Sequence, residues 1–286
     1  MRLRTLPVSI AGVVAAAGCA AHYHGFKVLP FIICLCFALL AQIVSNFANE
    51  YFDYRNGLDK PGRAGFRRGV TEGDISPAAM RNATFALLAL DCLIGASLII
   101  WGGWWLLFIG IAIATFALTY STGPWPLSHH GLGEIAVIVF FGFVPVVFTT
   151  FVQTQSWSMM PVTLPISLAI GFMGANVLVV NNYRDRDDDR AVGKHTLAVL
   201  WGPKAMEILY LLNGFIALLL IEFATIAWMP LLWQIGPLLY INLHWLLWQS
   251  LKNTEGSELN PVLGKTAMLM FATSLWILVA LAVNQA

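Results

Sequence analysis

Two stretches of the chain carry acidic residues at the spacing of one helical turn. The first is Asn49-Glu50-Tyr51-Phe52-Asp53, and the second begins at Asn181 and continues through Asp185 to Asp189. Residues i and i+4 lie on one face of a helix, so the side chains of each set project together. Both stretches contain Asn-x-x-x-Asp, which predicts two matching polar sites.

The residue types in these stretches indicate a cation. Carboxylates stacked on one helix face repel each other unless positive charge neutralises them. Carboxylate and amide oxygens are ligands that suit a hard cation such as Mg²⁺. The cysteines and histidines show no spacing typical of a zinc site. The sequence therefore predicts magnesium, with two ions if each stretch holds one.

Basic residues interleave with the acids. They are Arg55, Lys60, Arg67 and Arg68 after the first stretch, and Arg190 and Lys194 around the end of the second. Acids that hold Mg²⁺ beside arginine and lysine are what a diphosphate requires, because the metals and the basic side chains share its charge. The alternative is an ordinary solvated loop with incidental ion pairs, which we favour for Arg63, Arg81, Glu72, Asp74 and Lys204.

The elements that position these residues follow from composition. Of 286 residues, 58% are hydrophobic and 11% charged, whereas soluble domains carry about 25% charge. This excludes an ordinary soluble domain and a disordered chain. The net charge of +1 gives no indication of nucleic-acid binding. We expect an all-α polytopic membrane protein with the lipid bilayer as its surroundings.

Nine apolar stretches are long enough to be transmembrane helices. They cover residues 7–24, 29–48, 80–101, 103–120, 134–152, 162–181, 205–226, 229–250 and 266–283. The chain is interpreted as one domain over 1–286, a bundle of nine transmembrane helices with two Asp-rich cytoplasmic loops. The repeated Asn-x-x-x-Asp suggests a parallel four-helix repeat of spans 1–4 and 5–8.

The positive charges test this topology. Alternating spans place 15 of the 16 lysines and arginines on one side, and Lys27 alone on the other. The positive-inside rule then puts the N-terminus and the acid-bearing loops in the cytoplasm, with the C-terminus outside. We expect a multi-pass protein of a bacterial cytoplasmic (inner) membrane.

The motifs resemble those of a known family. The stretch from Gln42 to Asp59 is similar to the first motif of the UbiA superfamily of intramembrane aromatic prenyltransferases, and Asn182 to Leu197 is similar to the second. The opening Arg2-Leu3-Arg4-Thr5-Leu6-Pro7 and the stretch from Tyr120 to Glu134 also resemble this superfamily. The resemblance runs from residue 2 to about residue 200, and the last third matches in helix content alone.

The resemblance implies a role for each site residue. Asn49, Asp53 and Asp59 would hold one Mg²⁺, and Asp185 and Asp189 the other. Diphosphate would be bound by Arg67, Arg68, Lys60, Arg190 and Lys194. The acceptor, or the cation-like allylic carbon, would meet Tyr120, Tyr51, Tyr183 and Asn181, where plain packing is the alternative for the tyrosines.

One branch of the superfamily matches best. Gly57 stands where many members have a third Asp, and Asp59 follows two residues later. This pattern resembles the menaquinone-pathway branch, which implies transfer of a polyprenyl group from polyprenyl diphosphate to 1,4-dihydroxy-2-naphthoate with release of diphosphate and CO₂. Glu50 and Leu3 depart from the usual residues. An aromatic acid acceptor such as 4-hydroxybenzoate is the alternative.

A rival from another class is a cation-coupled transporter, which needs ionisable residues near the middle of the membrane. Asp91 lies inside the third span and is the one residue that supports this reading. We expect an interhelical hydrogen bond for it instead. A CDP-alcohol headgroup transferase is excluded, because its Asp-Gly-x-x-Ala-Arg signature is absent.

Overall fold

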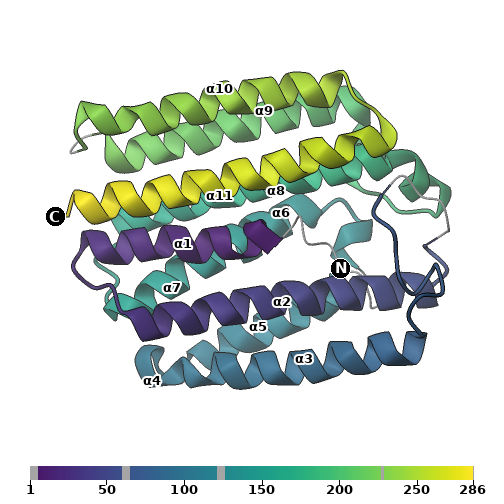
Figure 1. The fold of residues 1–286 in the computed structure, drawn as a ribbon, viewed down its shortest axis with the longest axis horizontal. Coiled ribbons are helices and arrows are strands. Elements are labelled where there is room, and N and C mark those ends of the chain that lie inside the picture. The colour runs from purple at the N-terminus through teal and green to yellow at the C-terminus, as the bar shows by residue number, and fades with distance from the viewer. Residues whose placement is uncertain (1–5, 60–64, 121–125, 227–228, 286) are drawn as a thin grey trace.

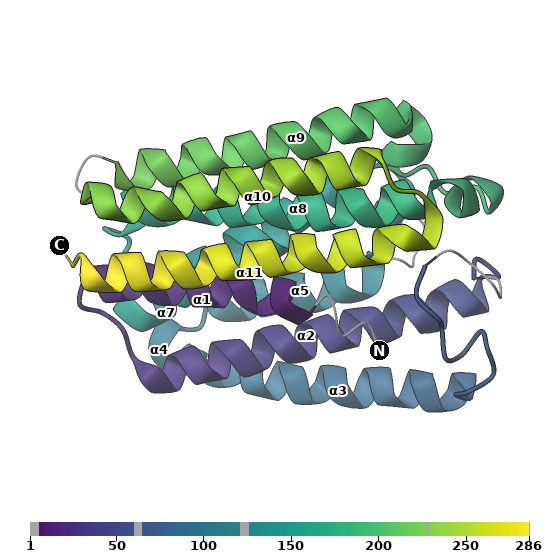
Figure 2. The ribbon, with the colours of Figure 1, turned by 45° about the horizontal axis from the view of Figure 1, so that its top comes forward.

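The computed structural model describes residues 6–59, 65–120, 126–226 and 229–285, and within these ranges every regular element is a helix. The helices run nearly parallel and antiparallel in one bundle (Figures 1 and 2). In chain order they are α1 (Leu6–His22), α2 (Val28–Arg55), α3 (Pro77–Ser97), α4 (Ile99–Gly102), α5 (Leu106–Thr119), η2 (Leu127–His129), α6 (Gly133–Val137), η3 (Ile138–Phe143), α7 (Val144–Thr154), α8 (Met160–Ala191), α9 (Leu197–Thr225), η4 (Leu231–Gln234), α10 (Ile235–Lys252), η5 (Gly256–Glu258) and α11 (Leu259–Val283).

Each predicted span coincides with a helical segment. Within the described residues, six helices are long and apolar enough to cross a membrane, and α1 and α5 are shorter apolar helices. The six are Val28–Arg55, Pro77–Gly102, Gly133–Thr154, Met160–Ala191, Leu197–Thr225 and Gly256–Val283. The protein is therefore an all-helical multi-pass membrane protein, while nine crossings remain a prediction.

The predicted Asp-rich loops are wrong in one respect, because most of these acids lie on helices. Helix α2 extends to Arg55 and α8 to Ala191, beyond the predicted ends at residues 48 and 181. The hydropathy pattern stops where charged residues begin, but the backbone hydrogen bonds continue to the end of each helix. Asp53, Asp185 and Asp189 are thus fixed by helical backbone.

Two matching caps end these helices. Gly57 has φ +68° after α2, where the amide of Leu58 donates to the carbonyl of Asp53 and that of Gly57 to Tyr54. After α8, Gly193 has φ +75°, and the amide of Lys194 donates to the carbonyl of Asp189. This pairing with a left-handed glycine is the Schellman motif, so Asp53 and Asp189 occupy the same position in two equivalent helix ends.

The caps give a different register from the sequence repeat. Aligning the two caps pairs Gly57 with Gly193 and Asp53 with Asp189, so Asn49 pairs with Asp185. The sequence match instead pairs Asp53 with Asp185, which is one helical turn away. The four-helix repeat itself stays a prediction.

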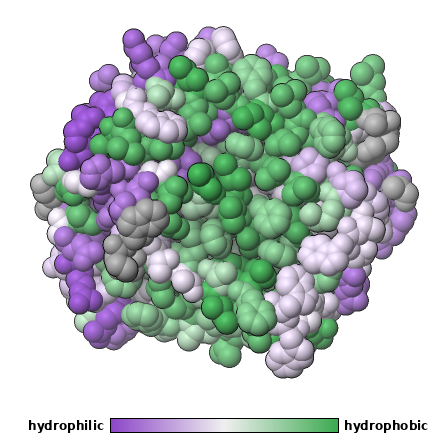
Figure 3. Space-filling view, turned by 180° about the vertical axis from the view of Figure 1, so that it is seen from behind, coloured by the Kyte–Doolittle hydropathy of each residue, from purple (hydrophilic) through white to green (hydrophobic). Residues whose placement is uncertain are grey.

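The bundle is unevenly packed. Helix α8 lies at its centre, and 78% of its most apolar 18-residue stretch is buried. The corresponding stretch of α3 with α4, which form an outer wall, is 11% buried. The main core joins α1 and α8 to α9, α10 and α11, and it includes Ile166, Tyr210 and Leu263. From behind, the middle of the molecule is a broad hydrophobic belt, and the densest hydrophilic surface gathers at one end (Figure 3). This is the surface expected of a protein embedded in lipid.

Candidate functional site

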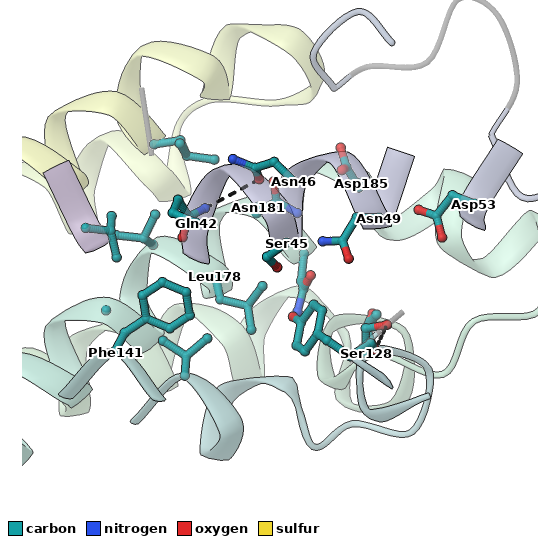
Figure 4. Close-up of a pocket in the computed structure, with 18 of the residues that line it drawn as sticks. Gln42, Ser45, Asn46, Asn49, Asp53, Ser128, Phe141, Leu178, Asn181 and Asp185 are labelled. Atoms are coloured by element: carbon teal, nitrogen blue, oxygen red, sulfur yellow. Dashed lines mark hydrogen bonds between the residues drawn. The ribbon is translucent and has the colours of Figure 1, made fainter. Parts of the chain in front are cut away.

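A cavity opens at the polar end of the bundle, between the C-terminal halves of α2 and α8 (Figure 4). Its lining residues come from both Asn-x-x-x-Asp stretches, from the segments that follow these helices, and from the surrounding helices α1, α5, η2, α6, η3 and α11. They are Val8, Gln42, Ser45, Asn46, Asn49, Asp53, Arg68, Phe116, Tyr120, Ser128, Val137, Phe141, Gly174, Val177, Leu178, Asn181, Asn182, Asp185, Asp189, Lys194, Thr196 and Leu263. Asp53 and Asp185, 132 residues apart in the chain, therefore share one cavity.

Asp53 is the centre of an ion-pair network. Its Oδ2 lies 3.4 Å from Nζ of Lys194 and 3.5 Å from Nη2 of Arg68. The same Nζ lies 4.0 Å from Oδ1 of Asp189, so Lys194 joins the acids of the two helices. Nε of Arg68 lies 3.3 Å from Oδ2 of Asp59. These charges are nearly all buried, which strengthens their interaction relative to exposed pairs.

Asp185 is held by its neighbour Arg184. Nε of Arg184 donates to Oδ1 of Asp185 at 2.7 Å, and Nη2 donates to Oδ2 at 2.9 Å. The same guanidinium donates to Oδ1 of Asn181 at 2.9 Å and Oδ1 of Asn260 at 2.7 Å, and it lies 5.2 Å from the ring centroid of Phe66. Arg184 thus fixes one carboxylate while it ties α8 to α11 and to the α2–α3 connection.

The segments around the cavity are also held in place. Oε1 of Glu50 accepts from the amide of Val70 at 3.0 Å, which anchors the connection that carries Arg68. The carbonyl of His129 accepts from the amide of His195 at 3.0 Å. The pKa of His129 is lowered because burial disfavours its charged form and Lys194 lies nearby. A neutral imidazole is therefore favoured there. Among the described residues that line the cavity, the cations are Arg68 and Lys194.

The described residues hold no preassembled group of three or more acidic, histidine or cysteine side chains that could bind a metal ion. The donors nevertheless fit magnesium. Asn49, Asp53, Asp185 and Asp189 supply only oxygen ligands to one cavity. Oδ1 of Asp53 is buried without a hydrogen-bond partner among the described residues, so it is available to a cation. In this structure the acids are paired with lysine and arginine side chains.

The structure brings together eight of the predicted site residues. Asn49, Asp53, Arg68, Tyr120, Asn181, Asp185, Asp189 and Lys194 line the cavity. Asp59 is buried behind Arg68. Lys60 lies outside the described residues.

Like Asp59, four more of the predicted residues do not line the cavity. Arg67 pairs with Asp74 at 2.9 Å and is 69% exposed, and Arg190 lies 3.6 Å from Asp187 and is 58% exposed. The hydroxyl of Tyr183 donates to Glu207 at 3.3 Å, and Tyr51 packs against Phe52. The contacts of Arg67 and Arg190 match ordinary surface ion pairs, and those of Tyr183 and Tyr51 match interhelical and local packing.

Sequence reasoning missed several lining residues, among them Gln42, Ser45, Asn46 and Ser128. The spacing of Gln42, Asn46, Asn49 and Asp53 places them along one face of α2, so helical periodicity in polar residues could have found them. The role of Arg184 had no such signal, because its partners Asn260 and Phe66 are distant in sequence.

A second, apolar cavity adjoins the first. It lies among α1, α2, α3, α5 and α7, and Gln42, Ser45, Phe116 and Phe141 line both. Asp91 lines the apolar cavity and is 4% exposed, and its Oδ1 has no hydrogen-bond partner among the described residues. The interhelical hydrogen bond that we predicted for Asp91 is not formed among the described residues.

A chain that buries acids and bases at one end of a lipid-embedded helical bundle, beside an apolar cavity, fits an intramembrane enzyme that handles an amphipathic substrate. The UbiA prenyltransferase family model matches residues 8–275. The chain belongs to this family and is a prenyltransferase.

Individual relatives point to one branch. The 1,4-dihydroxy-2-naphthoate octaprenyltransferase of Mycobacterium tuberculosis is 34% identical, over 99% of this chain and 96% of the relative. The protein of the same name from Haemophilus influenzae is 32% identical, over 94% of this chain and 89% of the relative.

Among solved structures, a UbiA homolog from Aeropyrum pernix matches with a TM-score of 0.73 at 18% identity, covering 99% of both chains. A UbiA homolog from Archaeoglobus fulgidus, bound to DMAPP and Mg²⁺, matches with a TM-score of 0.65 at 16% identity, covering 97% of this chain and 98% of that one. At these identities the likeness concerns the fold.

Proposed function

We propose that the protein transfers a polyprenyl group from polyprenyl diphosphate to 1,4-dihydroxy-2-naphthoate, in a reaction that depends on Mg²⁺. The observation that carries the proposal is the joined pair of cavities. One is lined by the acids of both helix ends and by Arg68 and Lys194, and the other is apolar. A polyprenyl diphosphate has the same two parts, and the relatives named above act in the same branch.

The diphosphate would bind at the polar end. Asn49, Asp53, Asp185 and Asp189 would hold two Mg²⁺ ions, with Asp59 contributing to the first site. Mg²⁺ bound there would neutralise charge that develops on the departing diphosphate. A homolog of the same fold from Archaeoglobus binds DMAPP and Mg²⁺, which supports a prenyl diphosphate and a divalent cation as ligands. Lys194 and Arg68 already lie within 3.5 Å of Asp53, so their side chains can turn from the acid to phosphate oxygens.

The prenyl chain would lie in the apolar cavity. Its wall of Leu, Ile, Phe and Val side chains gives the chain a dry environment. Exclusion of water matters for the chemistry, because water would capture the allylic carbon once its bond to diphosphate weakens. The ring of Tyr120 lines the polar cavity and packs 5.4 Å from Phe116, so it can face that carbon.

The reaction balances without a further reactant. A carbon–carbon bond forms between the allylic carbon and the ring carbon that bears the carboxylate, while the allylic carbon–oxygen bond breaks and diphosphate leaves. The bond between the ring and its carboxylate then breaks and releases CO₂, which restores the aromatic ring. The product is demethylmenaquinol, and 4-hydroxybenzoate is the alternative acceptor.

The protein is proposed to sit in a bacterial inner membrane with the polar cavity at the cytoplasmic face and the C-terminus outside. The support is the sorting of basic residues to one side of the bundle. The hydrophilic surface gathered at one end agrees with it (Figure 3).

An assay of the full chain in membranes tests the proposal. Labelled polyprenyl diphosphate and Mg²⁺ would be supplied with 1,4-dihydroxy-2-naphthoate or 4-hydroxybenzoate. We expect labelled product and CO₂ with the naphthoate and none when EDTA is present. Turnover with 4-hydroxybenzoate alone would overturn the choice of acceptor, and turnover in EDTA would remove the metal from the mechanism.

A further inference from the structure

Two amide side chains on α2 face the cavity in a fixed mutual orientation. Gln42 and Asn46 are one helical turn apart, and Nε2 of Gln42 donates to Oδ1 of Asn46 at 3.4 Å (Figure 4). This bond uses one donor and one acceptor of the pair. It leaves Oε1 of Gln42 as an acceptor and Nδ2 of Asn46 as a donor.

Both remaining atoms are buried and have no hydrogen-bond partner among the described residues. Asn46 is 8% exposed, and both side chains line the polar cavity. A buried polar group without a partner costs free energy, so such groups in a cavity are expected to meet a ligand or water. The pair presents one donor and one acceptor side by side.

The position of the pair suits the second substrate. Gln42 and Ser45 line both cavities, so the pair lies where the polar cavity meets the apolar one, next to Asn49 on the same helix face. Phe141 and Leu178 lie across the cavity from α2 in Figure 4 and offer an apolar surface to a flat ring. The prenyl chain carries no hydrogen-bonding groups, so it cannot satisfy the two amides.

We propose that Gln42 and Asn46 select the aromatic acceptor, by reading a carboxylate and a hydroxyl on neighbouring ring carbons. Nδ2 of Asn46 donates to the carboxylate, and Oε1 of Gln42 accepts from the adjacent hydroxyl. Side chains at i and i+4 have Cβ atoms about 5–6 Å apart, which suits ortho substituents. A para-hydroxy acid carries the two groups at opposite ends of its ring and cannot reach both amides.

This inference rests on the proposed function and also explains a feature of it. Arg68 and Lys194, the cations of the cavity wall, pair with acids at the diphosphate end. A neutral amide binds the carboxylate without the strong stabilisation that a cation gives it. The carboxylate can then leave as CO₂ at lower cost.

The test is steady-state kinetics of the full chain in lipid nanodiscs, with KM measured separately for donor and acceptor. Asn46→Asp replaces the donor with a second carboxylate at nearly constant shape. We expect its KM for 1,4-dihydroxy-2-naphthoate to rise by at least about tenfold, as for loss of a charged hydrogen bond, with the donor KM within about twofold. Gln42→Leu should raise the acceptor KM by a smaller factor, because it removes a neutral partner.

Asn82→Asp is the matched control, because Asn82 is exposed on α3 and its amide oxygen pairs with Arg81 outside both cavities. It should leave both KM values unchanged. Asn46→Ser serves if the Asp variant does not fold. An unchanged acceptor KM in Asn46→Asp, or equal rises for donor and acceptor, would overturn the inference.

The two proposals fail separately. If wild type prenylates 4-hydroxybenzoate instead of the naphthoate, the proposed function fails, and with it the ortho selection. If wild type uses the naphthoate but the variants discriminate between the two acids as wild type does, only the proposed selection by Gln42 and Asn46 is wrong. This second outcome is expected if the two amides bind water instead of the acceptor.

Discussion

Two regions of the bundle bury polar side chains, and they treat them differently. Between α8, α9, α10 and α11, the buried residues Asn176, Tyr210, Asn213 and Thr266 are joined by hydrogen bonds. Along α2 and α3, buried atoms of Gln42, Asn46, Asp53 and Asp91 have no partner among the described residues. Both regions lie in the same apolar surroundings, so the difference concerns what each region does.

The paired region is a continuous network. Nδ2 of Asn213 donates to Oδ1 of Asn176, and Nδ2 of Asn176 donates to the carbonyl of Tyr210, each at 3.0 Å. The Tyr210 hydroxyl lies 3.0 Å from that of Thr266, and its ring stacks on His244 with centroids 4.9 Å apart. Hydrogen bonds between such groups fix how helices pack. Unsatisfied groups are tolerated where a ligand completes them.

The largest expected effect is on the acids of the polar cavity. Asp53→Ala and Asp185→Ala should each lower turnover by about a thousandfold or more, because loss of metal-borne charge stabilisation is worth several kcal/mol. The measurement is the labelled-donor assay, with thermal unfolding to show that the fold is intact. Asp74→Ala is the control, since Asp74 pairs with exposed Arg67. Turnover near wild type in either variant would remove that acid from the metal site.

The next effect separates packing from function. A Cβ on Gly214 would overlap the His244 imidazole, whereas one on Gly110 would meet open space. Gly214→Ala should lower the free energy of unfolding by about 1–3 kcal/mol through overpacking, while the folded fraction keeps its KM values. Thermal unfolding in detergent measures it, with Gly110→Ala as control. If removing His244 as well does not recover part of the loss, the overlap is not its cause.

Arg184 tests how the acids are held. Arg184→Lys keeps the charge but loses the bidentate contact to Asp185, so Mn²⁺, as a probe of the magnesium site, should bind about tenfold more weakly. Titration monitored by Mn²⁺ resonance measures the affinity apart from activity. Arg186→Lys, which contacts Asp187 near the surface, is the control. Equal Mn²⁺ affinities in the two variants would contradict a positioning role.

The smallest effects should have opposite signs. Asp91→Leu removes a carboxyl with a buried, unpartnered oxygen and should stabilise the fold by about 1 kcal/mol. Asn176→Leu removes one hydrogen bond to the carbonyl of Tyr210 and leaves the side-chain amide of Asn213 without its partner, so it should destabilise the fold by about 2 kcal/mol. Unfolding by heat or denaturant measures the change in the free energy of unfolding for each variant. Changes of the same sign would contradict the distinction between the two regions.

The sequence predicted the parts that depend on local pattern. Apolar runs predicted the helical segments, and helical spacing placed Asn49, Asp53, Asp185 and Asp189 together. The ends of α2 and α8 were predicted too early, because hydropathy falls at the membrane edge while the helical hydrogen bonds do not. Gly57 and Gly193 were not identified from the sequence as the residues that cap these helices.

The remaining features depend on tertiary contacts. Helical periodicity groups Gln42 and Asn46 with Asn49, but it does not show that they face a cavity while Asn176 and Asn213 are paired in the core. The contacts of Arg184 with Asn260 and Phe66 join segments that no spacing relates. Which polar residue finds a partner is decided by how the helices pack.

The two matching caps have an electrostatic consequence for substrate binding. Phosphates usually bind at helix N-termini, where the backbone dipoles are positive. Here α2 and α8 both end at the site, and each C-terminus carries about half a negative elementary charge. The backbone therefore adds about one negative charge to a cavity already lined by three carboxylates. An anion is not held there by these dipoles, so cations must accompany it. Arg68 and Lys194 supply part of that positive charge, and the Mg²⁺ that we propose would supply the rest.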